Sequence, residues 1–220
     1  MKLLYLIRDP YPTTRPDVLT LFGRQLARRG VVSDIVATRQ GELADQQLPW
    51  PAGDAFIHEP GGRGGWRRRL GALWHDLRCL ARGRAYDAVV VRDKILSASL
   101  ALCRPGRGPV IYWASFPFPE EDLARAALPG RGVLSRTLLR ARGQMTALLL
   151  YRWVLPRADA VFVQSDRMAE QFARRAGRTE SMTAVPMGVD PEGLPPARVE
   201  PVRWREGDPF HLVYLGSMDR

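Results

Sequence analysis

Short apolar runs alternate with longer amphipathic segments along most of this chain, and this alternation is the feature that most limits its fold. Runs rich in Val, Ile, Leu and aromatic residues occur at 2–8, 31–38, 87–92, 109–115 and 159–165. Continuous apolar runs are typical of strands buried on both faces. Because right-handed crossovers place a helix over each pair of parallel strands, the pattern predicts an α/β fold with a Rossmann-like, doubly wound parallel sheet.

The segments between these runs show the periodicity and the capping residues of helices. Asp17 opens the first helix and Gly30 ends it, and the helices are predicted at residues 17–30, 66–82, 95–102, 132–155 and 166–176. Residues 41–65 are punctuated by Pro and Gly and residues 116–121 are rich in Pro, so both are predicted to be loops. A further short strand is predicted to end at Val185.

The last part of the chain reads differently from the rest. Residues 196–209 are rich in Pro and charge, as in a linker, and residues 210–220 read as a buried strand that runs into a glycine turn. A strand of this kind is typical of the beginning of a domain. We therefore expect one domain at 1–195, a linker at 196–209, and the start of a truncated second domain at 210–220.

The composition is that of an ordinary folded protein, but the charge is not. Of the 220 residues, 45% are hydrophobic and 25% are charged, which is average for globular domains. The formal net charge of +10 favours phosphates, nucleic acid or anionic lipid as partners. Apart from Lys2 and Lys94 the positive side chains are all arginines. A generally basic surface with no specific anionic ligand therefore stays open as an interpretation.

Cysteine spacing and hydropathy restrict the class of protein further. Cys79 and Cys103 have no ligand spacing, so we expect no metal site and two buried, reduced thiols. The apolar run after Met1 is too short for a signal peptide. No run reaches the roughly 18 apolar residues of a membrane span. These features predict a cytoplasmic protein that contacts membranes, if at all, peripherally.

Several common nucleotide and hydrolase sites are absent from the sequence. The loop after the first strand, residues 9–17, lacks the G-x-G-x-x-G pattern that lets backbone approach a pyrophosphate, and its prolines remove N–H donors. The chain contains no G-x-x-x-x-G-K-[ST] and no G-x-S-x-G segment. Dinucleotide binding, P-loop phosphate chemistry and serine hydrolysis are therefore disfavoured.

Polar residues follow several of the predicted strands, at the edge where doubly wound sheets bind ligands. The first loop offers hydroxyl and guanidinium groups that could hydrogen-bond a polyol and hold an anion, namely Arg8, Tyr11, Thr13, Thr14 and Arg15. This set suits a sugar or a sugar phosphate. The alternative is that the Thr and Pro residues only shape a turn and Asp17 caps the next helix.

Two other strand ends carry polar candidates. Arg92 and Asp93, with Lys94, could bind an acceptor phosphate, or they could form ion pairs at the surface. Ser165 lies between a strand and a helix, so its hydroxyl is expected to be an N-cap, with a contact to the ligand cleft as a second role.

Four segments in order carry a resemblance: residues 86–92, 158–165, 185–190 and 212–217. Together they resemble the N-terminal half of family 4 retaining glycosyltransferases of the GT-B fold. The resemblance implies sugar transfer from a nucleotide-sugar donor, a hexosyl transfer with retention, and no metal or other cofactor. It also implies that this half binds mainly the acceptor. The donor-binding domain would be missing from residues 1–220, and these residues by themselves would not catalyse sugar transfer.

The resemblance also implies roles for single residues. Gly188 and Asp190 match the turn that lines the cleft near the donor, and Gly216 and Ser217 match the first turn of the donor domain. Many family members place a His near the reacting sugar, where this chain has Trp-Ala-Ser115. Ser115 or Glu120 could supply the polar group, although Glu120 also suits a helix first turn. The catalytic residues therefore stay unassigned.

The helices at 66–82 and 132–155 mix arginines with large apolar residues. Such helices either pack on the sheet with solvated arginines or lie on anionic lipid. In the lipid interpretation the acceptor is a lipid-linked saccharide or a phospholipid, used in bacterial surface polysaccharide or glycolipid synthesis at the inner face of the cell membrane. The competing hypothesis is a basic, non-catalytic module or fragment that binds membrane, a partner or nucleic acid. We expect no nucleic acid, because no aromatic-basic strand motif is present.

Overall fold

The computed structural model describes residues 1–13, 15–39, 49–60, 65–130, 132–177 and 182–188. The chain divides into two units, Met1–Val189 and Asp190–Arg220. The second unit lies outside the described residues, as do the predicted linker at 196–209 and the predicted strand at 210–220. The domain limits given above therefore stay predictions.

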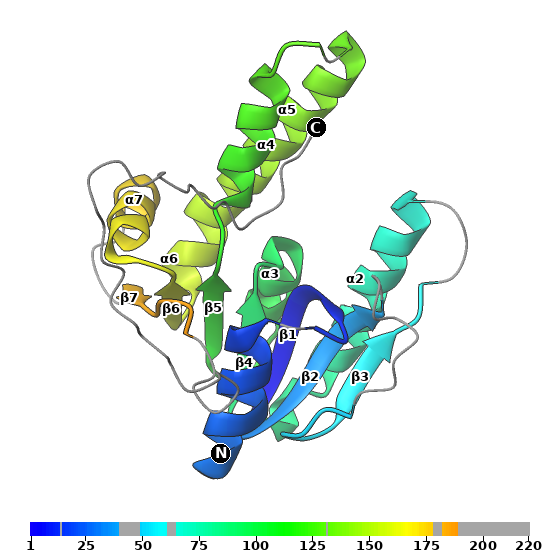
Figure 1. Cartoon of the computed structure of the whole chain (residues 1–220), viewed down its shortest axis with the longest axis vertical. Helices are drawn as coiled ribbons and strands as arrows, with labels where there is room; N and C mark the ends of the chain where they lie inside the picture. The colour runs from blue at the N-terminus through cyan, green and yellow to red at the C-terminus, as the bar shows by residue number, and fades with distance from the viewer. Residues whose placement is uncertain (14, 40–48, 61–64, 131, 178–181, 189–220) are drawn as a thin grey trace, which may run out of the picture. The chain divides into compact units, whose positions relative to one another are not determined.

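The described residues form a sheet of seven parallel strands in the order β3-β2-β1-β4-β5-β6-β7, which confirms the predicted doubly wound α/β fold (Figure 1). The chain builds outward from β1 to β3 on one side and from β4 to β7 on the other, so the order reverses between β1 and β4. Ligands of such sheets bind at this reversal, outside the carboxyl ends of the strands. The strands are β1 (Lys2–Tyr11), β2 (Val32–Arg39), β3 (Ala55–His58), β4 (Ala88–Arg92), β5 (Val110–Ala114), β6 (Ala160–Val163) and β7 (Met182–Ala184).

Helical segments connect most of the strands. They are η1 (Asp17–Gln25), α1 (Leu26–Arg28), α2 (Gly65–Ala81), η2 (Gly83–Ala85), α3 (Ile95–Cys103), α4 (Phe118–Ala127), α5 (Val133–Leu149), η3 (Leu150–Val154), α6 (Leu155–Arg157) and α7 (Asp166–Ala176). Segment η1 is π-helical and continues into α1, while α5, η3 and α6 follow one another without a break. The predicted helices at 66–82, 95–102, 132–155 and 166–176 are confirmed within a few residues.

Alternate residues of each strand pack on opposite faces of the sheet, as the pleat requires. Leu4 and Leu6 of β1 belong to a core with Leu80 of α2, Ala98 of α3 and Phe172 of α7. Each of these side chains is fully buried or nearly so. Burying a large apolar side chain stabilises a fold by about 1.5–3 kcal/mol. This face, with the helices α2, α3, η3 and α7, holds the larger core.

The other face is covered by η1. Tyr5 of β1 stacks on Phe22 of η1, with ring centroids 3.9 Å apart, and Phe22 meets Trp113 of β5 edge-on at 5.6 Å. Trp50, from the described segment before β3, belongs to the same core. The strands β1, β2, β4 and β5 are therefore buried on both faces, which explains their continuous apolar sequences.

Helices α4 and α5 lie side by side and extend beyond the carboxyl edge of the sheet (Figure 1). Gly143 of α5 is buried against α4, and a Cβ atom at this position would lie 2.9 Å from Cγ of Leu123. Arg142 donates from Nε to Asp122 of α4 at 2.7 Å. A close glycine contact and an ion pair thus hold the two helices together.

Three local predictions were wrong. The predicted loop at 41–65 contains β3, a short edge strand that pairs with β2 from Ile35–Ala55 to Thr38–His58. The predicted loop at 116–121 contains the start of α4, because Pro119 lies in the first turn, where a missing N–H costs nothing. Cys103 is exposed, whereas Cys79 is buried as predicted.

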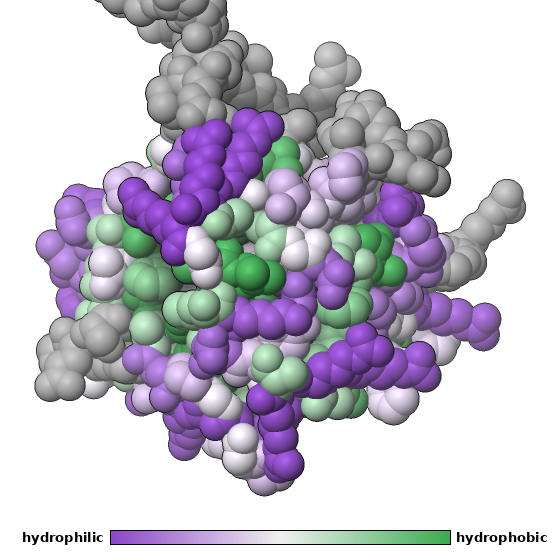
Figure 2. Space-filling view, turned by 90° about the horizontal axis from the view of Figure 1, so that it is seen from below, coloured by the Kyte–Doolittle hydropathy of each residue, from purple (hydrophilic) through white to green (hydrophobic). Residues whose placement is uncertain are grey.

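Figure 2 views the molecule from below Figure 1, from the side on which the N-terminus lies. On this face hydrophobic residues occur in small groups between hydrophilic ones. The strands begin near this side and end at the opposite edge, where ligands of doubly wound sheets bind. The functional site is therefore expected at the carboxyl edge.

Candidate functional site

A pocket of about 470 Å³ lies at the carboxyl edge of the sheet, beside the point where the strand order reverses. Its lining comes from the ends of β1, β2 and β4, from α2, from the start of α3, and from α4 and α5. A volume of this size holds a ligand of a few hundred daltons. The place is the one that the fold predicts for a ligand.

The walls of the pocket combine positive charge with apolar surface. Its basic side chains are Arg8, Arg68, Arg69, Lys94 and Arg142. The apolar part includes Leu70, Leu73, Leu96 and Phe118. Such a lining suits a ligand that has both an anionic group and an apolar part.

The acidic residues of the pocket already form hydrogen bonds or ion pairs with neighbouring side chains. Asp76 accepts from Lys94 at 2.8 Å and from Ser97 at 2.6 Å. Asp122 binds Arg142. Within the described residues, Arg68 and Arg69 have no ion pair and no side-chain hydrogen bond. These two guanidinium groups are exposed and available to an anion.

The amino end of α3 adds to the positive potential. Ile95, Leu96 and Ser97, the first three residues of α3, all line the pocket. The helix has no capping side chain, so its first amide groups lack a partner from the helix itself. Free amides and the helix dipole both favour a negative charge at this position.

Arg8 forms one wall by stacking on an aromatic ring. Its guanidinium carbon lies 3.5 Å from the centroid of Phe118, at the start of α4. The contact connects the end of β1 to the helix pair α4–α5 and fixes the direction of the guanidinium. Its edge keeps donors for a ligand, because stacking uses only its face.

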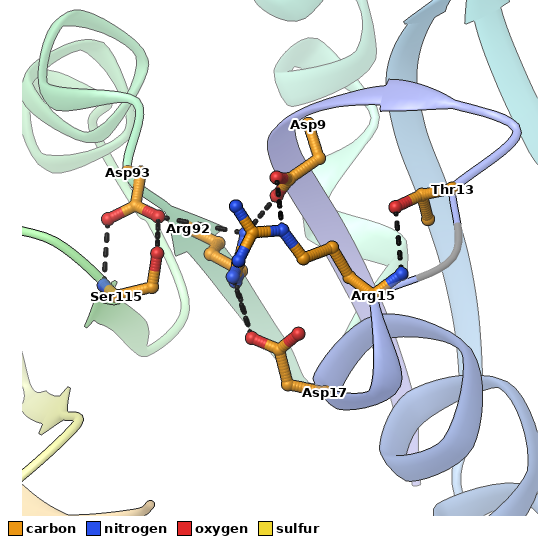
Figure 3. Close-up of polar contacts among 7 residues, drawn as sticks. All are labelled: Asp9, Thr13, Arg15, Asp17, Arg92, Asp93 and Ser115. Carbon is orange, nitrogen blue, oxygen red and sulfur yellow. Dashed lines mark hydrogen bonds and ion pairs between the residues drawn. The ribbon is translucent and has the colours of Figure 1, made fainter. Parts of the chain in front are cut away.

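A buried cluster of charged residues lies at this carboxyl edge of the sheet (Figure 3). Arg92, the last residue of β4, is 1% exposed and binds Asp17 from Nε at 3.0 Å and from Nη2 at 2.6 Å. It also binds Asp9 of β1. Asp9 in turn pairs with Arg15 at 3.2 Å. The cluster joins the ends of β1 and β4 to the start of η1.

Asp93 continues the cluster toward the pocket. Its backbone is in the left-handed region, with φ of 58°, which aspartate tolerates better than most residues. Its carboxylate accepts from the amide of Ser115 at 2.8 Å and from the Ser115 hydroxyl (Figure 3). Burial raises the pKa of Asp93, although the Ser115 contacts and Arg92 act in the opposite direction.

The comparison with sequence families identifies the chain. The profile described as Glycosyltransferase Family 4 matches residues 18–192.

The chain belongs to glycosyltransferase family 4.

No curated protein sequence matches the family 4 chain. Among solved structures, it is similar to UDP-GlcNAc 2-epimerase from Methanocaldococcus jannaschii, with a TM-score of 0.50, 14% identity, and coverage of 84% of this chain and 45% of that one. Anabaena Alr3699/HepE in complex with UDP gives a TM-score of 0.48 and 14% identity, over 86% of this chain and 45% of that one. The structure of HepE with UDP and glucose gives 0.48 and 16%, with the same coverage. The chain thus spans about 45% of the length of these proteins. At this level of identity the likeness to the epimerase shows the fold alone.

The structure brings two of the predicted acceptor-binding residues of the family 4 chain into the pocket, Arg8 and Asp93. Three others, Tyr11, Thr13 and Arg15 of the first loop, do not line the pocket. Tyr11 is buried beside Trp50 in the core under η1, and Thr13 accepts from the amide of Arg15 at 3.2 Å, as in a turn. Thr14, which also belongs to the first-loop set, lies outside the described residues.

The charge cluster shows that two of the alternative predictions for the strand ends were wrong. Asp17 does not cap η1, because it is the first residue of that helix and its carboxylate binds Arg92. Arg92 is not in a surface ion pair, because its side chain is buried among carboxylates. Its role is to support the edge on which a ligand would lie.

The two candidate catalytic side chains are both engaged. The Ser115 hydroxyl donates to Asp93. The Glu120 carboxylate accepts from the Tyr151 hydroxyl at 2.6 Å and pairs with Arg175, so it ties α4 to η3 and α7. Neither residue lines the pocket.

Two further candidates, Ser165 and Gly188, follow β6 and β7. Ser165 is the N-cap of α7 and accepts from the Met168 amide at 3.2 Å, which confirms the capping role. A side chain at Gly188 would meet no described atom within 4 Å. The donor-side candidates Asp190, Gly216 and Ser217 lie outside the described residues.

Sequence reasoning did not assign the pocket residues of the helices. Arg68 and Arg69 belong to a basic helix whose composition was noted, but its position over the carboxyl edge was not predicted. Phe118 was placed in a loop. The strand-end rule finds residues that directly follow strands, whereas these side chains come from the middle and ends of helices.

Proposed function

We propose that this chain forms the acceptor-side domain of a retaining glycosyltransferase, which transfers a hexosyl group from a nucleotide sugar to a glycan or a lipid-linked acceptor. The observation that carries the proposal is the pocket at the carboxyl edge of a family 4 domain, where Arg68, Arg69 and Arg8 surround apolar surface. An acceptor with a phosphate or other anionic group fits this lining best.

The donor is assigned to residues outside the described part of the chain. Asp190, Gly216 and Ser217 would be the first of them, and Gly188 would contribute from the described part of the chain. A glycine at the first turn of the donor domain would let backbone approach the diphosphate of a nucleotide sugar. The proposal includes no metal and no cofactor apart from the donor itself.

We assign no chemical step to Ser115 or Glu120. The hydroxyl of Ser115 is committed to Asp93, and the carboxylate of Glu120 is committed to Tyr151 and Arg175. Both therefore act in this proposal as positioning residues of the carboxyl edge. Arg92, Asp9 and Asp17 act in the same way.

The cellular setting belongs to the proposal as well. We place the protein in the cytoplasm, at the inner face of a bacterial cell membrane, in the synthesis of surface polysaccharide or glycolipid. No helix in the described part of the chain has the length and apolarity of a membrane span. In this proposal, contact with the membrane is made by surfaces of this domain.

The test is a comparison of ligands by saturation-transfer NMR and calorimetry. A phosphate-bearing glycan acceptor is expected to bind the chain more tightly than a free nucleotide sugar does. Changing Arg68 and Arg69 together to Gln should weaken acceptor binding at least tenfold, because a single charge-assisted hydrogen bond contributes about 1.5–3 kcal/mol. The matched control is Arg29→Gln, an exposed arginine of the α1 end that does not line the pocket.

Two results would contradict the proposal. One is tight binding of a nicotinamide or flavin dinucleotide by the same pocket. The other is binding of unrelated oligonucleotides that weakens steeply with salt and is affected equally by the pocket variant and the Arg29 variant, because that behaviour belongs to a basic, non-catalytic module.

A further inference from the structure

Helix α5 carries an apolar stripe that no described residue covers. The stripe consists of side chains three or four residues apart, Leu134, Leu138, Ala141, Met145 and Leu148. The four large ones are 74%, 62%, 61% and 64% exposed, in that order. At 100° per residue this spacing places all five on one side of the helix. An exposed stripe of this length on an otherwise well-packed domain marks an interaction surface.

The stripe lies next to the pocket. On α5, Gly143 faces α4, while Arg142 and Thr146 line the pocket. By the helical repeat, Leu138 and Met145 are only about 40–60° around the helix from Arg142, on the side away from α4. The exposed leucines therefore border the pocket.

Helix α2 presents a matching stripe on the other side of the pocket. Trp66, Leu70 and Trp74 are spaced four residues apart and are 64%, 55% and 56% exposed. Leu70 also lines the pocket. Arg67 lies over the ring of Trp66 at 5.4 Å, and Arg78 lies over that of Trp74 at 5.3 Å. Tryptophans combined with arginines are typical of the interface between water and lipid.

The turn between α4 and α5 extends the apolar surface to the far end of the helix pair, at the top of Figure 1. Leu128 at the end of α4 is 51% exposed, and Val133 at the start of α5 is 80% exposed. An apolar tip that continues an exposed stripe enlarges the candidate interaction surface. It can enter the acyl boundary of a bilayer.

The positive charges beside the apolar stripes favour an anionic bilayer over a second copy of the chain as the partner. Arg67, Arg68 and Arg69 lie on successive positions of α2, beside its apolar stripe. Packing these stripes against a second copy of the chain would bring like charges together, which is unfavourable. An anionic bilayer can bind both the apolar stripes and the arginines, because the leucines can be buried in its acyl region and the arginines can pair with its phosphates.

We propose that the stripes of α2 and α5, with the α4–α5 turn, seat this domain on an anionic bilayer, and that the pocket between them takes the anionic head group of a membrane lipid as acceptor. The head group enters from the bilayer surface and meets Arg8, Arg68 and Arg69, while the acyl chains stay in the membrane. The assignment of this lipid as acceptor rests on the proposed function, whereas the docking does not.

The test of docking is flotation of the chain with phosphatidylcholine vesicles, with and without phosphatidylglycerol. The variant Leu138→Gln/Met145→Gln removes two exposed side chains of the α5 stripe and should reduce the bound fraction on anionic vesicles about tenfold, because each loses its burial in the acyl boundary. Val32→Gln, an exposed apolar residue at the start of β2, is the control and should float like the unchanged chain. Circular dichroism confirms that each variant is folded.

Equal flotation of the stripe variant and the Val32 variant would overturn the docking surface. So would sedimentation equilibrium showing a dimer that only the stripe variant dissociates, with no vesicle binding. The arginine pair is tested with the lipid itself. Short-chain phosphatidylglycerol should bind the chain more tightly than free glycerol phosphate, and Arg68→Gln/Arg69→Gln should weaken the binding of both, because both carry the phosphate. Equal binding of the two probes would overturn the membrane lipid as the source of the head group.

The two proposals can fail separately. Flotation requires neither donor nor sugar transfer, so a chain that floats by its stripes but binds no glycan or lipid acceptor would contradict the proposed function and the lipid assigned as acceptor, but not the docking. A chain that binds a soluble glycan acceptor but ignores vesicles would contradict only the docking.

Discussion

Arg92 donates two hydrogen bonds to Asp17, from Nε at 3.0 Å and from Nη2 at 2.6 Å, although the two residues are 75 positions apart in the sequence. This pair joins the end of β4 to the start of η1, across the point where the strand order reverses. Because Arg92 is buried, its charge depends on Asp9 and Asp17 to remain satisfied. The pair therefore fixes the carboxyl edge on which the pocket is built.

Replacing Arg92 by Met should reduce the free energy of unfolding by about 3–5 kcal/mol, because the change leaves buried carboxylates without a partner. The measurement is urea unfolding followed by circular dichroism. Arg15→Met is the control, since Arg15 is 49% exposed and its pair with Asp9 should contribute only about 0–1 kcal/mol. Equal losses in the two variants would contradict the structural role of Arg92.

Two substitutions at Ser165 can distinguish its role as an N-cap from a contact with the ligand. Ser165→Ala removes the acceptor for the Met168 amide and should cost about 0.5–2 kcal/mol of stability. Ser165→Asp keeps an N-cap and should recover that loss. If the hydroxyl also touches an acceptor, the Asp variant will be stable yet bind the acceptor more weakly in calorimetry; unchanged affinity would leave Ser165 with the capping role only.

The imidazole of His75 should make stability depend on pH. Burial lowers the pKa of His75 below its ordinary value, with Asp76 opposing and His58 assisting. The folded state then binds a proton less readily than the unfolded chain, so stability is lost as the pH falls through the unfolded pKa near 6.5.

The measurement for His75 is the urea midpoint at about pH 7.5 and about pH 5.5, on either side of the ordinary histidine pKa. The difference between the two midpoints should shrink in His75→Gln, which cannot take up the proton. An identical difference in the variant and the unchanged chain would show that His75 is not responsible.

Gly143 should tolerate no larger side chain. Gly143→Val places atoms into Leu123, and we expect a loss of about 1–3 kcal/mol, as for overpacked cores. Helix propensity favours Val over Gly, so a loss must come from the contact between α4 and α5. Gly188→Val is the control, because no described atom lies within 4 Å of its Cβ position. A stability gain at Gly143 in thermal unfolding would show that the two helices are not closely packed.

Most of the fold could be predicted from the sequence because the central strands are buried on both faces. Their continuous apolar runs, such as Ala88–Arg92, argue against strands that have one face exposed to solvent. The edge strand Ala55–His58 was missed, since its side chains are only partly buried and its sequence carries no strong period. Helix α4 was missed because Pro117 and Pro119 read as a loop, although proline is well accepted in a first helical turn.

The candidate site was predicted less completely. Strand ends located Arg8 and Asp93 in the pocket, because the carboxyl ends of parallel strands share one edge. Tyr11, only three residues after Arg8, faces the core under η1. Which side a residue faces at the end of β1 depends on a local irregularity in its pairing with β2, between Leu6 and Pro10, and no sequence pattern encodes it.

The order of most strands and helices, the doubly wound class and the place of the ligand edge follow from the sequence, because they depend on local hydrophobic pattern and on the handedness of crossovers. Only the tertiary structure decided that Arg92 is buried between Asp9 and Asp17, and that Arg68 and Arg69 of α2 meet Arg8 at one pocket. The reason is physical: charge pairing and burial depend on distances between residues far apart in the chain, which folding sets and local pattern does not.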